Sequence, residues 1–374
     1  MTAQNSAKLI TSAAEIGAAR WNALANPSGA PDPHPFTTFE FFAALEESGS
    51  ASRQTGWQPA HLLMDDGLMP MYLKSHSYGE YVFDHAWAEA LERAGGDYYP
   101  KLQCAVPFTP VTGKRLLGNK DALLKTAAVA TRQLGASSLH ITFLTREEWQ
   151  AAGEAGYLLR TGQQFHWENP GYTSFDQFLG ELSSAKRKNL RKERASVRDA
   201  GVTFEWLTGA DITEAHWDQF YDFYMDTGGR KWGTPYLTRE FFSRLGQSLS
   251  HQTLLIMAKQ DGRYVAGALN LFGDGVLFGR NWGAADYIPF LHFETCYYQA
   301  MEFCIERGIA LFEGGAQGEH KLARGFEPVE TWSAHWLRHP EFADAVQRFL
   351  QREGAAMDGY IDELRDRSPY KRKE

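Results

Sequence analysis

One stretch of the chain, residues 287–337, restricts the possible folds more than any other. Within it, apolar side chains recur at steps of three and four positions from Phe293 to Ile305, which predicts an α-helix with one buried face. Gly308 is a typical helix end, because glycine can take the left-handed conformation there. The apolar run 309–312 is long enough for a buried strand. A helix followed by such a strand predicts an α/β unit, in which ligands meet the loops after the carboxyl ends of the strands.

A glycine-rich polar loop, residues 313–321, comes directly after this predicted strand. Its glycines let the backbone approach a ligand closely or take positive φ angles. These glycines are Gly314, Gly315 and Gly318, and the residues around them carry two carboxylates, an amide, an imidazole and an ammonium: Glu313, Gln317, Glu319, His320 and Lys321. Since position and chemical content agree, we interpret the loop as a functional site, against the alternative of a solvated polar turn.

Length and composition predict two packed domains. The chain has 374 residues, and domains of roughly 150 residues suggest a division into residues 1–167 and 168–374. An apolar content of 43% and an aromatic content of 14% are ample for packed cores. The formal net charge of −8 argues against a protein that coats nucleic acid with its whole surface, so we expect no DNA partner. A local basic site is compatible with this charge.

Cysteine usage and hydropathy argue against several classes of protein. The three cysteines, Cys104, Cys296 and Cys304, form no CxxC pair, and the last two lie on the predicted apolar helix face. We therefore expect small core residues, without a disulfide framework and without a metal site. The first 16 residues lack the apolar core of a signal peptide, and no apolar run approaches the roughly 18 residues of a membrane span. We expect a cytoplasmic protein.

The order of predicted elements is similar in the two halves. The first half reads as helix, hairpin, strand, loop, helix, strand, helix and strand, and the second as basic helix, strand, two helices, three antiparallel strands, helix, strand, loop and strand. Asp-Asp-Gly at 65–67, Asp-Gly at 261–262 and Gly-Asp-Gly at 273–275 are hairpin turn signals. We also expect a strand at 81–87, a flexible loop at 228–233 and a C-terminal helix at 342–364.

The predicted helix 183–199 is unusually basic for an acidic protein. It carries seven cations against two anions: Lys186, Arg187, Lys188, Arg191, Lys192, Arg194 and Arg198 against Glu193 and Asp199. Like charges four residues apart repel each other along a helix unless something offsets them. The helix is therefore either a solvated face or a site for a phosphate-bearing substrate, an RNA or an acidic partner, with Arg187, Lys188 and Arg191 as candidate contacts.

Two motifs resemble a known family. Residues 182–193, followed by Gly201-Val202, resemble the basic helix of FemAB-like acyltransferases of the bacterial peptidoglycan-biosynthesis type. The segment 312–328 resembles the closing motif of that family, in which a strand ends in an acidic residue and two glycines and a lysine, here Lys321, precedes a Gly-Phe pair. The element order resembles the GNAT fold in both halves, so the resemblance covers most of the chain.

This resemblance implies a mixed α/β protein with a tandem GNAT-like fold that transfers an acyl or aminoacyl group to an amine acceptor. The acceptor is a small molecule or a cell-envelope precursor. Residues 283–292 do not match the glycine-rich pyrophosphate loop of ordinary acetyltransferases. Acyl-CoA therefore stays open as a donor substrate, beside aminoacyl-tRNA, and we expect no tightly bound cofactor. The long coiled-coil arm of some Fem ligases has no counterpart in the sequence.

Acyl transfer to an amine needs a base, a group that stabilises the oxyanion and groups that hold both substrates. Candidate bases are Glu313, Glu319 and His320. His292 and Glu294, near the N-terminus of the preceding helix, are alternatives, and the other interpretation of Glu294 is an acid that complements the helix N-terminus. Lys321 is the candidate for neutralising the oxyanion or a donor phosphate, aided by the backbone of Gly314 and Gly315. Candidate substrate contacts are Gln317, Arg324, Arg280 and Asn281.

Three functions stay open at this stage. The first is an N-acyltransferase that acts on a small or cell-envelope amine. The second is an aminoacyl-tRNA-dependent peptidyltransferase, which the basic helix and the atypical loop favour. The third is a non-catalytic binding protein that kept the fold, because a fold does not fix a function. The sequence leaves the oligomeric state open.

Overall fold

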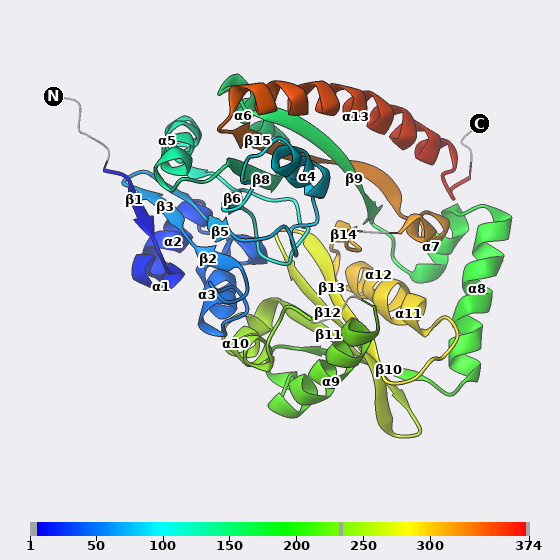
Figure 1. Ribbon diagram of the computed structural model, residues 1–374. Helices are drawn as coiled ribbons and strands as arrows, with labels where there is room; N and C mark the ends of the chain where they lie inside the picture. The colour runs from blue at the N-terminus through cyan, green and yellow to red at the C-terminus, as the bar shows by residue number, and fades with distance from the viewer. Residues whose placement is uncertain (1–5, 232–234, 317, 372–374) are drawn as a thin grey trace. The chain divides into compact units, whose positions relative to one another are not determined.

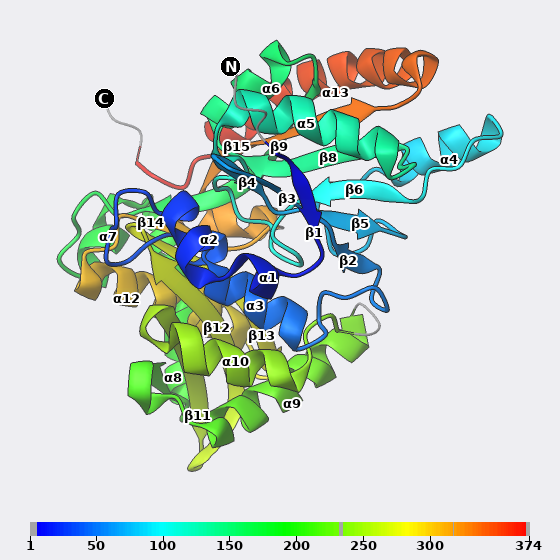
Figure 2. The ribbon, with the colours of Figure 1, turned by 90° about the vertical axis from the view of Figure 1, so that its left-hand side faces the viewer.

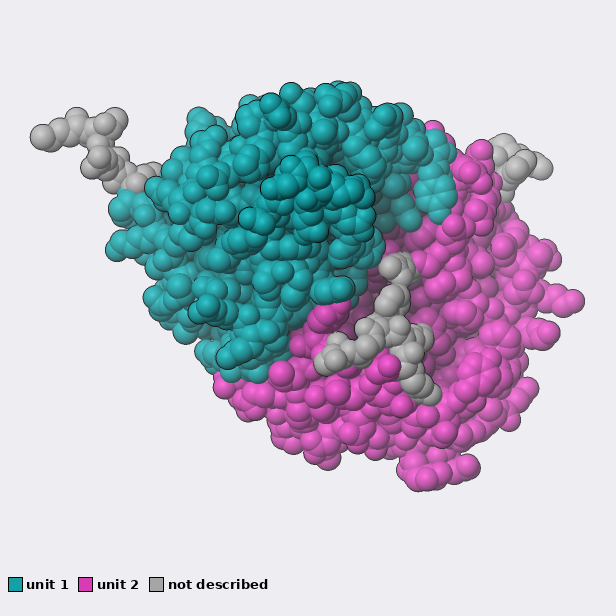
Figure 3. Space-filling model, in the orientation of Figure 1, with its two compact units in different colours: residues 1–163, 330–360 teal, residues 164–329, 361–374 magenta. Residues whose placement is uncertain are grey.

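The computed structural model describes residues 6–231, 235–316 and 318–371 (Figure 1). The chain divides into two compact units, unit 1 with residues 1–163 and 330–360 and unit 2 with residues 164–329 and 361–374 (Figure 3). The chain passes between them three times, within β9 (Leu158–Glu168), β15 (Glu327–Leu337) and α13 (Pro340–Asp366). The predicted domains 1–167 and 168–374 stay a prediction, while the compact units themselves are discontinuous in sequence.

Unit 2 contains a mixed sheet in the order β10-β11-β12-β13-β14-β9. Besides β9, the strands of this sheet are β10 (Thr203–Thr208), β11 (Thr253–Gln260), β12 (Arg263–Gly273), β13 (Val276–Ala284) and β14 (Leu311–Glu313). All neighbours are antiparallel except β13 and β14, which are parallel. Both predicted hairpin turns are confirmed, because Asp261 and Asp274 have positive φ angles of 52° and a glycine with positive φ follows each.

Helices in unit 2 follow the apolar periodicity closely. They are α7 (Phe175–Glu181), α8 (Ser184–Asp199), α9 (Glu214–Lys231), α10 (Arg239–Leu249), α11 (Leu291–Phe293) and α12 (Gln299–Arg307). Gly308 ends α12 in the left-handed conformation, as predicted. The predicted loop 228–233 is wrong at its start, because α9 continues through its two glycines to Lys231; residues 232–234 lie outside the described residues. None of the helices in the described ranges is long and apolar enough to cross a membrane.

Unit 1 contains a sheet in the order β15-β8-β6-β5-β2 and a smaller sheet in the order β1-β3-β4-β7. The strands are β1 (Lys8–Ile10), β2 (Trp57–Pro59), β3 (His61–Met64), β4 (Gly67–Met69), β5 (Tyr72–Lys74), β6 (Lys101–Cys104), β7 (Leu117–Gly118) and β8 (Ser138–Leu144). The helices are α1 (Ala13–Ile16), α2 (Ala18–Ala25), α3 (Phe39–Glu47), α4 (His85–Arg93), α5 (Lys120–Gln133), α6 (Arg146–Glu154) and most of α13.

The strand predicted at residues 81–87 is wrong. Residues 75–84 form a loop, and α4 begins at His85. The apolar residues Trp87, Ala88 and Leu91 recur with helical spacing and pack together on α13 and the end of β15. Aromatic residues such as Tyr81 and Phe83 are frequent in strands, but the helical spacing that begins at Trp87 determines the element here.

Both faces of the unit 1 sheet are buried, but their chemistry differs. Successive residues of a strand point to opposite faces. On β6 and β8 the apolar face is formed by Leu102, Cys104, Leu139 and Ile141, which pack in one cluster with α5 and α6 (Figure 2). The opposite face carries Lys101, Gln103, His140 and Thr142, which are equally buried. The sheet therefore separates an apolar core from a polar interior.

Two histidines in this polar interior must stay neutral for the fold to be stable. The Nδ1 atoms of His140 and His335 lie 2.7 Å apart, so one ring donates a hydrogen bond and the other accepts it. Burial and the nearby Lys101 lower the pKa of His140 to about 3. Burial and the neighbouring His140 lower the pKa of His335 well below its usual value.

We expect the free energy of unfolding to respond to pH through this pair. Below about pH 6.5 the unfolded chain binds protons at both histidines and the folded chain does not, so each lowers stability by about 1.4 kcal/mol per pH unit. Glu80 acts in the opposite direction, because burial raises its pKa to about 7. The contribution of the two histidines is therefore measured by comparing variants with the wild type. Urea unfolding gives the free energy of unfolding of each protein between pH 7 and pH 5. His335→Asn should lose less stability on acidification than the wild type, whereas His251→Asn, at an exposed position, should behave like the wild type.

Candidate active site

Strands β13 and β14 diverge in the middle of unit 2. They pair only from Val276 to Phe278 on β13, opposite Leu311 to Glu313 on β14. Directly after this point the register of β12 and β13 shifts, because Leu269 pairs with Asn281 and Asn270 with Gly279. Arg280 is thus the extra residue of a β-bulge, a feature that bends a strand and redirects its side chains. Beyond Glu313 the chain leaves the sheet.

A small pocket of about 80 Å³ occupies this divergence. It is lined by the bulged part of β12 and β13, by Gly314 after β14 and by the start of the following helix: Ala268, Leu269, Asn270, Gly279, Arg280, Asn281, Trp282, His292, Cys296, Tyr297 and Gly314. The structure therefore brings together Arg280, Asn281, His292 and Gly314 of the predicted site. The pocket lies beyond the carboxyl end of β14, where the strand order predicts a ligand.

A π-helical turn, Glu294–Tyr298, decides which side chains reach the pocket. Such a turn holds one extra residue and is frequent at functional sites. It places Cys296 and Tyr297 in the pocket lining, while Glu294 and Tyr298 bond to α8. Ideal 3.6-residue periodicity does not reveal a π turn, so it predicts Cys296 as a core residue and misses its place in the pocket lining.

Lys321 lies buried directly behind the glycine loop. Lys321 is 2% exposed, and its Nζ donates a hydrogen bond of 2.7 Å to the carbonyl oxygen of Gly315. Among the described residues it forms no ion pair with a carboxylate. Burial lowers the pKa of Lys321 to about 7, opposed by the nearby Cys296. This lysine can therefore act with or without its proton near neutral pH.

His320 connects the loop to the pocket through a tyrosine. Its Nε2 lies 3.0 Å from the hydroxyl of Tyr297. Burial and the neighbouring charges of Arg324 and Lys321 lower the pKa of His320, so the ring is neutral at pH 7. Burial raises the pKa of Tyr297, which keeps its hydroxyl protonated. Tyr297 lines the pocket, and His320 lies behind it as its hydrogen-bond partner.

Glu313 is buried at the end of β14, with one carboxylate oxygen 3.9 Å from Nε2 of His166. Burial and the charge of Lys321 lower the pKa of His166 to about 4, so this contact is not an ion pair at neutral pH. Glu319 lies elsewhere, in an exposed ion pair of 3.2 Å with Arg367. Gln317 lies outside the described residues.

Arg324 points toward α8 rather than into the pocket. It donates hydrogen bonds of 2.8 and 3.2 Å to the carboxylate of Glu193 and one of 2.7 Å to the backbone oxygen of His320. Its guanidinium also lies 3.4 Å from the ring centroid of Phe293. Arg324 thus fixes the glycine loop to α8, and this inward partner, 131 residues away in sequence, was not predictable from local pattern.

The basic helix α8 has an inner and an outer face. On the inner face Arg194 binds Glu294 and Glu302 with hydrogen bonds of 2.9 to 3.1 Å. Glu294 is therefore a structural partner and not a free base. On the outer face Arg191 forms an exposed ion pair with Asp176. Lys188, exposed, and Arg187, half-buried, form no ion pair with a described residue. The neighbours Lys186 and Lys192 likewise lack an ion pair in the part of the chain that the structure describes.

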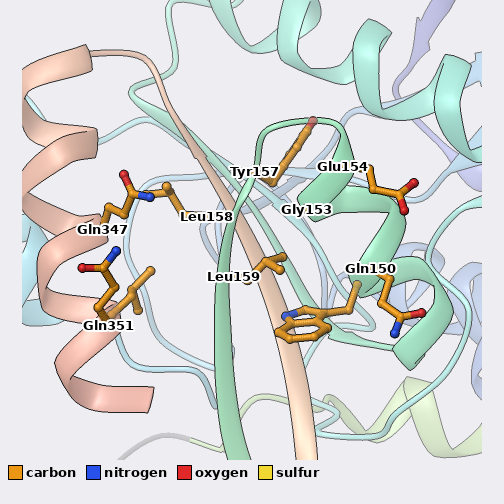
Figure 4. A pocket seen from close by; sticks show the side chains of 10 residues that line it. Gln150, Gly153, Glu154, Tyr157, Leu158, Leu159, Gln347 and Gln351 are labelled. Atoms are coloured by element: carbon orange, nitrogen blue, oxygen red, sulfur yellow. The ribbon is translucent and has the colours of Figure 1, made fainter. Parts of the chain in front are cut away.

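A larger groove of about 750 Å³ lies in unit 1 between α6, the start of β9 and α13. Gln347 and Gln351 reach from α13 toward Leu158 and Leu159 (Figure 4). The lining combines amides and apolar side chains, and its carboxylate, Glu154, has no histidine or lysine beside it in the lining. The lining thus offers a carboxylate but no cationic side chain that could stabilise an oxyanion, and the chemistry is better placed in unit 2.

Comparisons with known proteins concern the family and the fold of the chain. A family model named FemAB-like, described as peptidoglycan biosynthesis/recognition, matches residues 12–372. No curated protein matches the chain. The structure of FemX is similar over 91% of this chain and 100% of its own, with a TM-score of 0.55 and 12% identity.

Two further solved structures are similar. The C-terminal domain of a putative lysylphosphatidylglycerol synthetase from Agrobacterium fabrum covers 90% of this chain and 96% of its own, with a TM-score of 0.54 and 12% identity. L-PGS from Bacillus licheniformis covers 85% and 98%, with a TM-score of 0.52 and 13% identity. At these identities the likeness concerns the fold alone. The expected mixed α/β, tandem GNAT-like fold is confirmed.

We expect Arg194→Ala to destabilise unit 2 by roughly 3 kcal/mol, because it leaves the buried carboxylate of Glu294 without its counter-ion. Arg191→Ala is the matched control on the same helix, since its ion pair with Asp176 is exposed and such pairs contribute less than about 1 kcal/mol. Denaturant unfolding of both variants measures the difference. Equal stability of the two variants would contradict a structural role for the Arg194–Glu294 pair.

Proposed function

The chain belongs to the FemAB-like family, and we propose that it is a transferase that moves an acyl or aminoacyl group from an activated donor to an amine, with a cell-envelope precursor as the acceptor. The observation that carries this proposal is Lys321, a buried lysine that bonds to the glycine loop, whose Gly314 lines the pocket. An ammonium held in a water-poor site stabilises a developing oxyanion far better than it would in water.

The proposed reaction is an addition followed by an elimination. The acceptor amine attacks the carbonyl carbon of the donor, a C–N bond forms, and the carbonyl electron pair moves to oxygen. Lys321 holds that oxyanion. The intermediate then expels the donor alcohol or thiol, and the oxyanion becomes an amide carbonyl.

Protons must move in both steps. The amine attacks only after losing a proton, and the leaving group takes one up. The neutral His320 is our candidate for accepting the proton of the amine, through the hydroxyl of Tyr297 at the pocket wall. Glu313 and His292 are the alternative bases within this unit, whereas Glu319 lies in its surface ion pair.

We favour aminoacyl-tRNA over acyl-CoA as the donor, for one specific reason. Four cations of α8, Lys186, Arg187, Lys188 and Lys192, form no ion pair with a described residue, and Lys188 and Lys192 are exposed. Such a cluster suits a polyanionic backbone. One similar structure is named a putative lysylphosphatidylglycerol synthetase, a name that speaks of lysyl attachment in that protein and leaves the donor open. Acyl-CoA remains the second candidate donor.

Replacing Lys321 tests the reaction itself. We expect Lys321→Ala to lower turnover by about 10²-fold or more, the scale of losing one oxyanion donor. Turnover is measured with a charged tRNA and with an acyl-CoA as donors, beside thermal unfolding to confirm the fold. Lys259→Ala, which removes a partly exposed lysine of the same unit, is the control and should keep full turnover. Near-normal turnover of Lys321→Ala would remove Lys321 from the mechanism.

The role of the cations of α8 is tested by charge reversal. We expect Arg187→Glu combined with Arg191→Glu to weaken tRNA binding strongly and to reduce the steepness of its salt dependence, because fewer phosphate counter-ions are released. A gel shift or calorimetric titration at several salt concentrations measures this. Arg365→Glu, on the exposed end of α13, is the matched control. Unchanged affinity of the double variant at low salt would make α8 a solvated face.

A further inference from the structure

The groove of unit 1 beside α6, β9 and α13 lies outside the proposed reaction. Its volume of about 750 Å³ is within the range of small-ligand sites. Gln347 and Gln351 line it from α13 and Gln150 lines it from α6, with Leu158 and Leu159 of β9 between them (Figure 4). The chemistry of these side chains indicates which class of ligand the groove can hold.

Three amides of the lining are available to a ligand. Gln150, Gln347 and Gln351 are exposed, and none of their side chains hydrogen-bonds to a described residue. Gln347 and Gln351 are four residues apart on α13, so they lie on one face of this helix. Each amide carries two N–H donors and an acceptor oxygen. The groove therefore suits a ligand whose groups both donate and accept hydrogen bonds.

An indole N–H adds a donor that no described residue satisfies. Trp149 is half-buried, packs against the apolar core cluster of unit 1 and lines the groove. Its Nε1 atom is buried and has no hydrogen-bond partner among the described residues. An indole N–H can only donate, and a buried donor without an acceptor is costly. An occupant of the groove that brings an oxygen acceptor removes this cost.

The deeper part of the lining is apolar. Leu350 and Tyr157 are buried, and Leu159 is half-buried. The hydroxyl of Tyr157 donates a hydrogen bond of 2.8 Å to the backbone oxygen of Leu124, so this residue offers its ring, not its hydroxyl, to the groove. Aromatic and aliphatic side chains of this kind contact the C–H groups of a ligand. The ligand therefore combines hydrogen-bonding groups with an apolar face.

The charge of the lining narrows the class further. Among the described residues that line the groove there is no lysine, arginine or histidine, and the one carboxylate is the exposed Glu154. A phosphate or carboxylate ligand would find no cationic partner here. Peptides are usually recognised through the backbone of a strand edge or through apolar and charged pockets, whereas here side-chain amides face the ligand. Sugar rings meet these demands, because they combine neutral hydroxyl groups with C–H faces.

We propose that this groove binds a neutral saccharide. The amides of Gln150, Gln347 and Gln351 bind its hydroxyl groups. Nε1 of Trp149 donates to one of its oxygen atoms, and the apolar residues around Leu159 contact its C–H face. The site lies wholly in unit 1 and does not rest on the proposed transferase reaction, so its test needs no measurement of turnover.

The test is a calorimetric titration of the full chain with cellotetraose and chitotetraose, two neutral tetrasaccharides. Inorganic phosphate serves as the anionic probe and acetyl-tetraglycine amide as the neutral peptide probe. We expect at least one of the saccharides to bind and to slow hydrogen exchange of residues 149–159 and 347–351. We expect phosphate and the peptide to do neither.

Variants locate the binding in the groove. Gln347→Ala combined with Gln351→Ala should weaken saccharide binding roughly tenfold or more, the scale of two hydrogen bonds. Trp149→Phe keeps an aromatic ring and removes the N–H group, and should weaken binding roughly fivefold, the scale of one hydrogen bond. Gln133→Ala is the matched control, because it removes an exposed amide at the end of α5, outside the lining, and should bind like the wild type.

Three results would overturn the proposal. The first is that neither saccharide binds the wild type at millimolar concentration, a result that needs no variant and so does not depend on a variant folding. The second is equal affinity of the wild type, the double glutamine variant and Trp149→Phe, with thermal unfolding showing that both variants fold. The third is binding of the peptide or of phosphate in place of the saccharides, which would assign the groove to another class of ligand.

Discussion

The candidate active site depends on where two strands stop pairing. β13 and β14 share three residue pairs and then separate at the bulge formed by Arg280. The ring of Phe326 packs against Gly314, directly after β14. A Cβ atom on Gly314 would lie only 2.8 Å from this ring, so the position has no room for a side chain. The loop that follows can therefore pass close to the bulge, and Lys321 supports it from behind. A longer pairing of β13 with β14 would close the pocket.

Helix α8 contacts two segments at the candidate site of unit 2, the glycine loop and the π-helical turn. Its inward residues Glu193 and Arg194 bind Arg324 and Glu294, which hold the glycine loop and the π-helical turn in place. Its outward lysines remain without partners among the described residues. One helix thus fixes the wall of the pocket and presents a cationic surface to solvent. A change on its inner face is expected to act through stability, and a change on its outer face through binding of anions.

Local patterns in the sequence predicted most elements but only part of the site. Periodicity and turn residues predicted α12, α13 and the hairpins at Asp261-Gly262 and Asp274-Gly275, because these depend on near neighbours. The position of the glycine loop followed from element order. The inward ion pair of Arg324, the π turn at Glu294–Tyr298 and the polar face around Lys101 depend on partners far away in the chain. Spacing alone therefore could not reveal them.

The division of the chain has a consequence for its synthesis. Strand β8 pairs with β15 through residues such as His140 and His335, almost two hundred positions apart. At the usual pace of translation, on the order of tens of seconds pass before β15 emerges. During that time one edge of β8 is open, next to an apolar face, and open edges invite pairing with other chains. The nascent chain is thus most exposed to aggregation, and most in need of a chaperone, while unit 2 is being made.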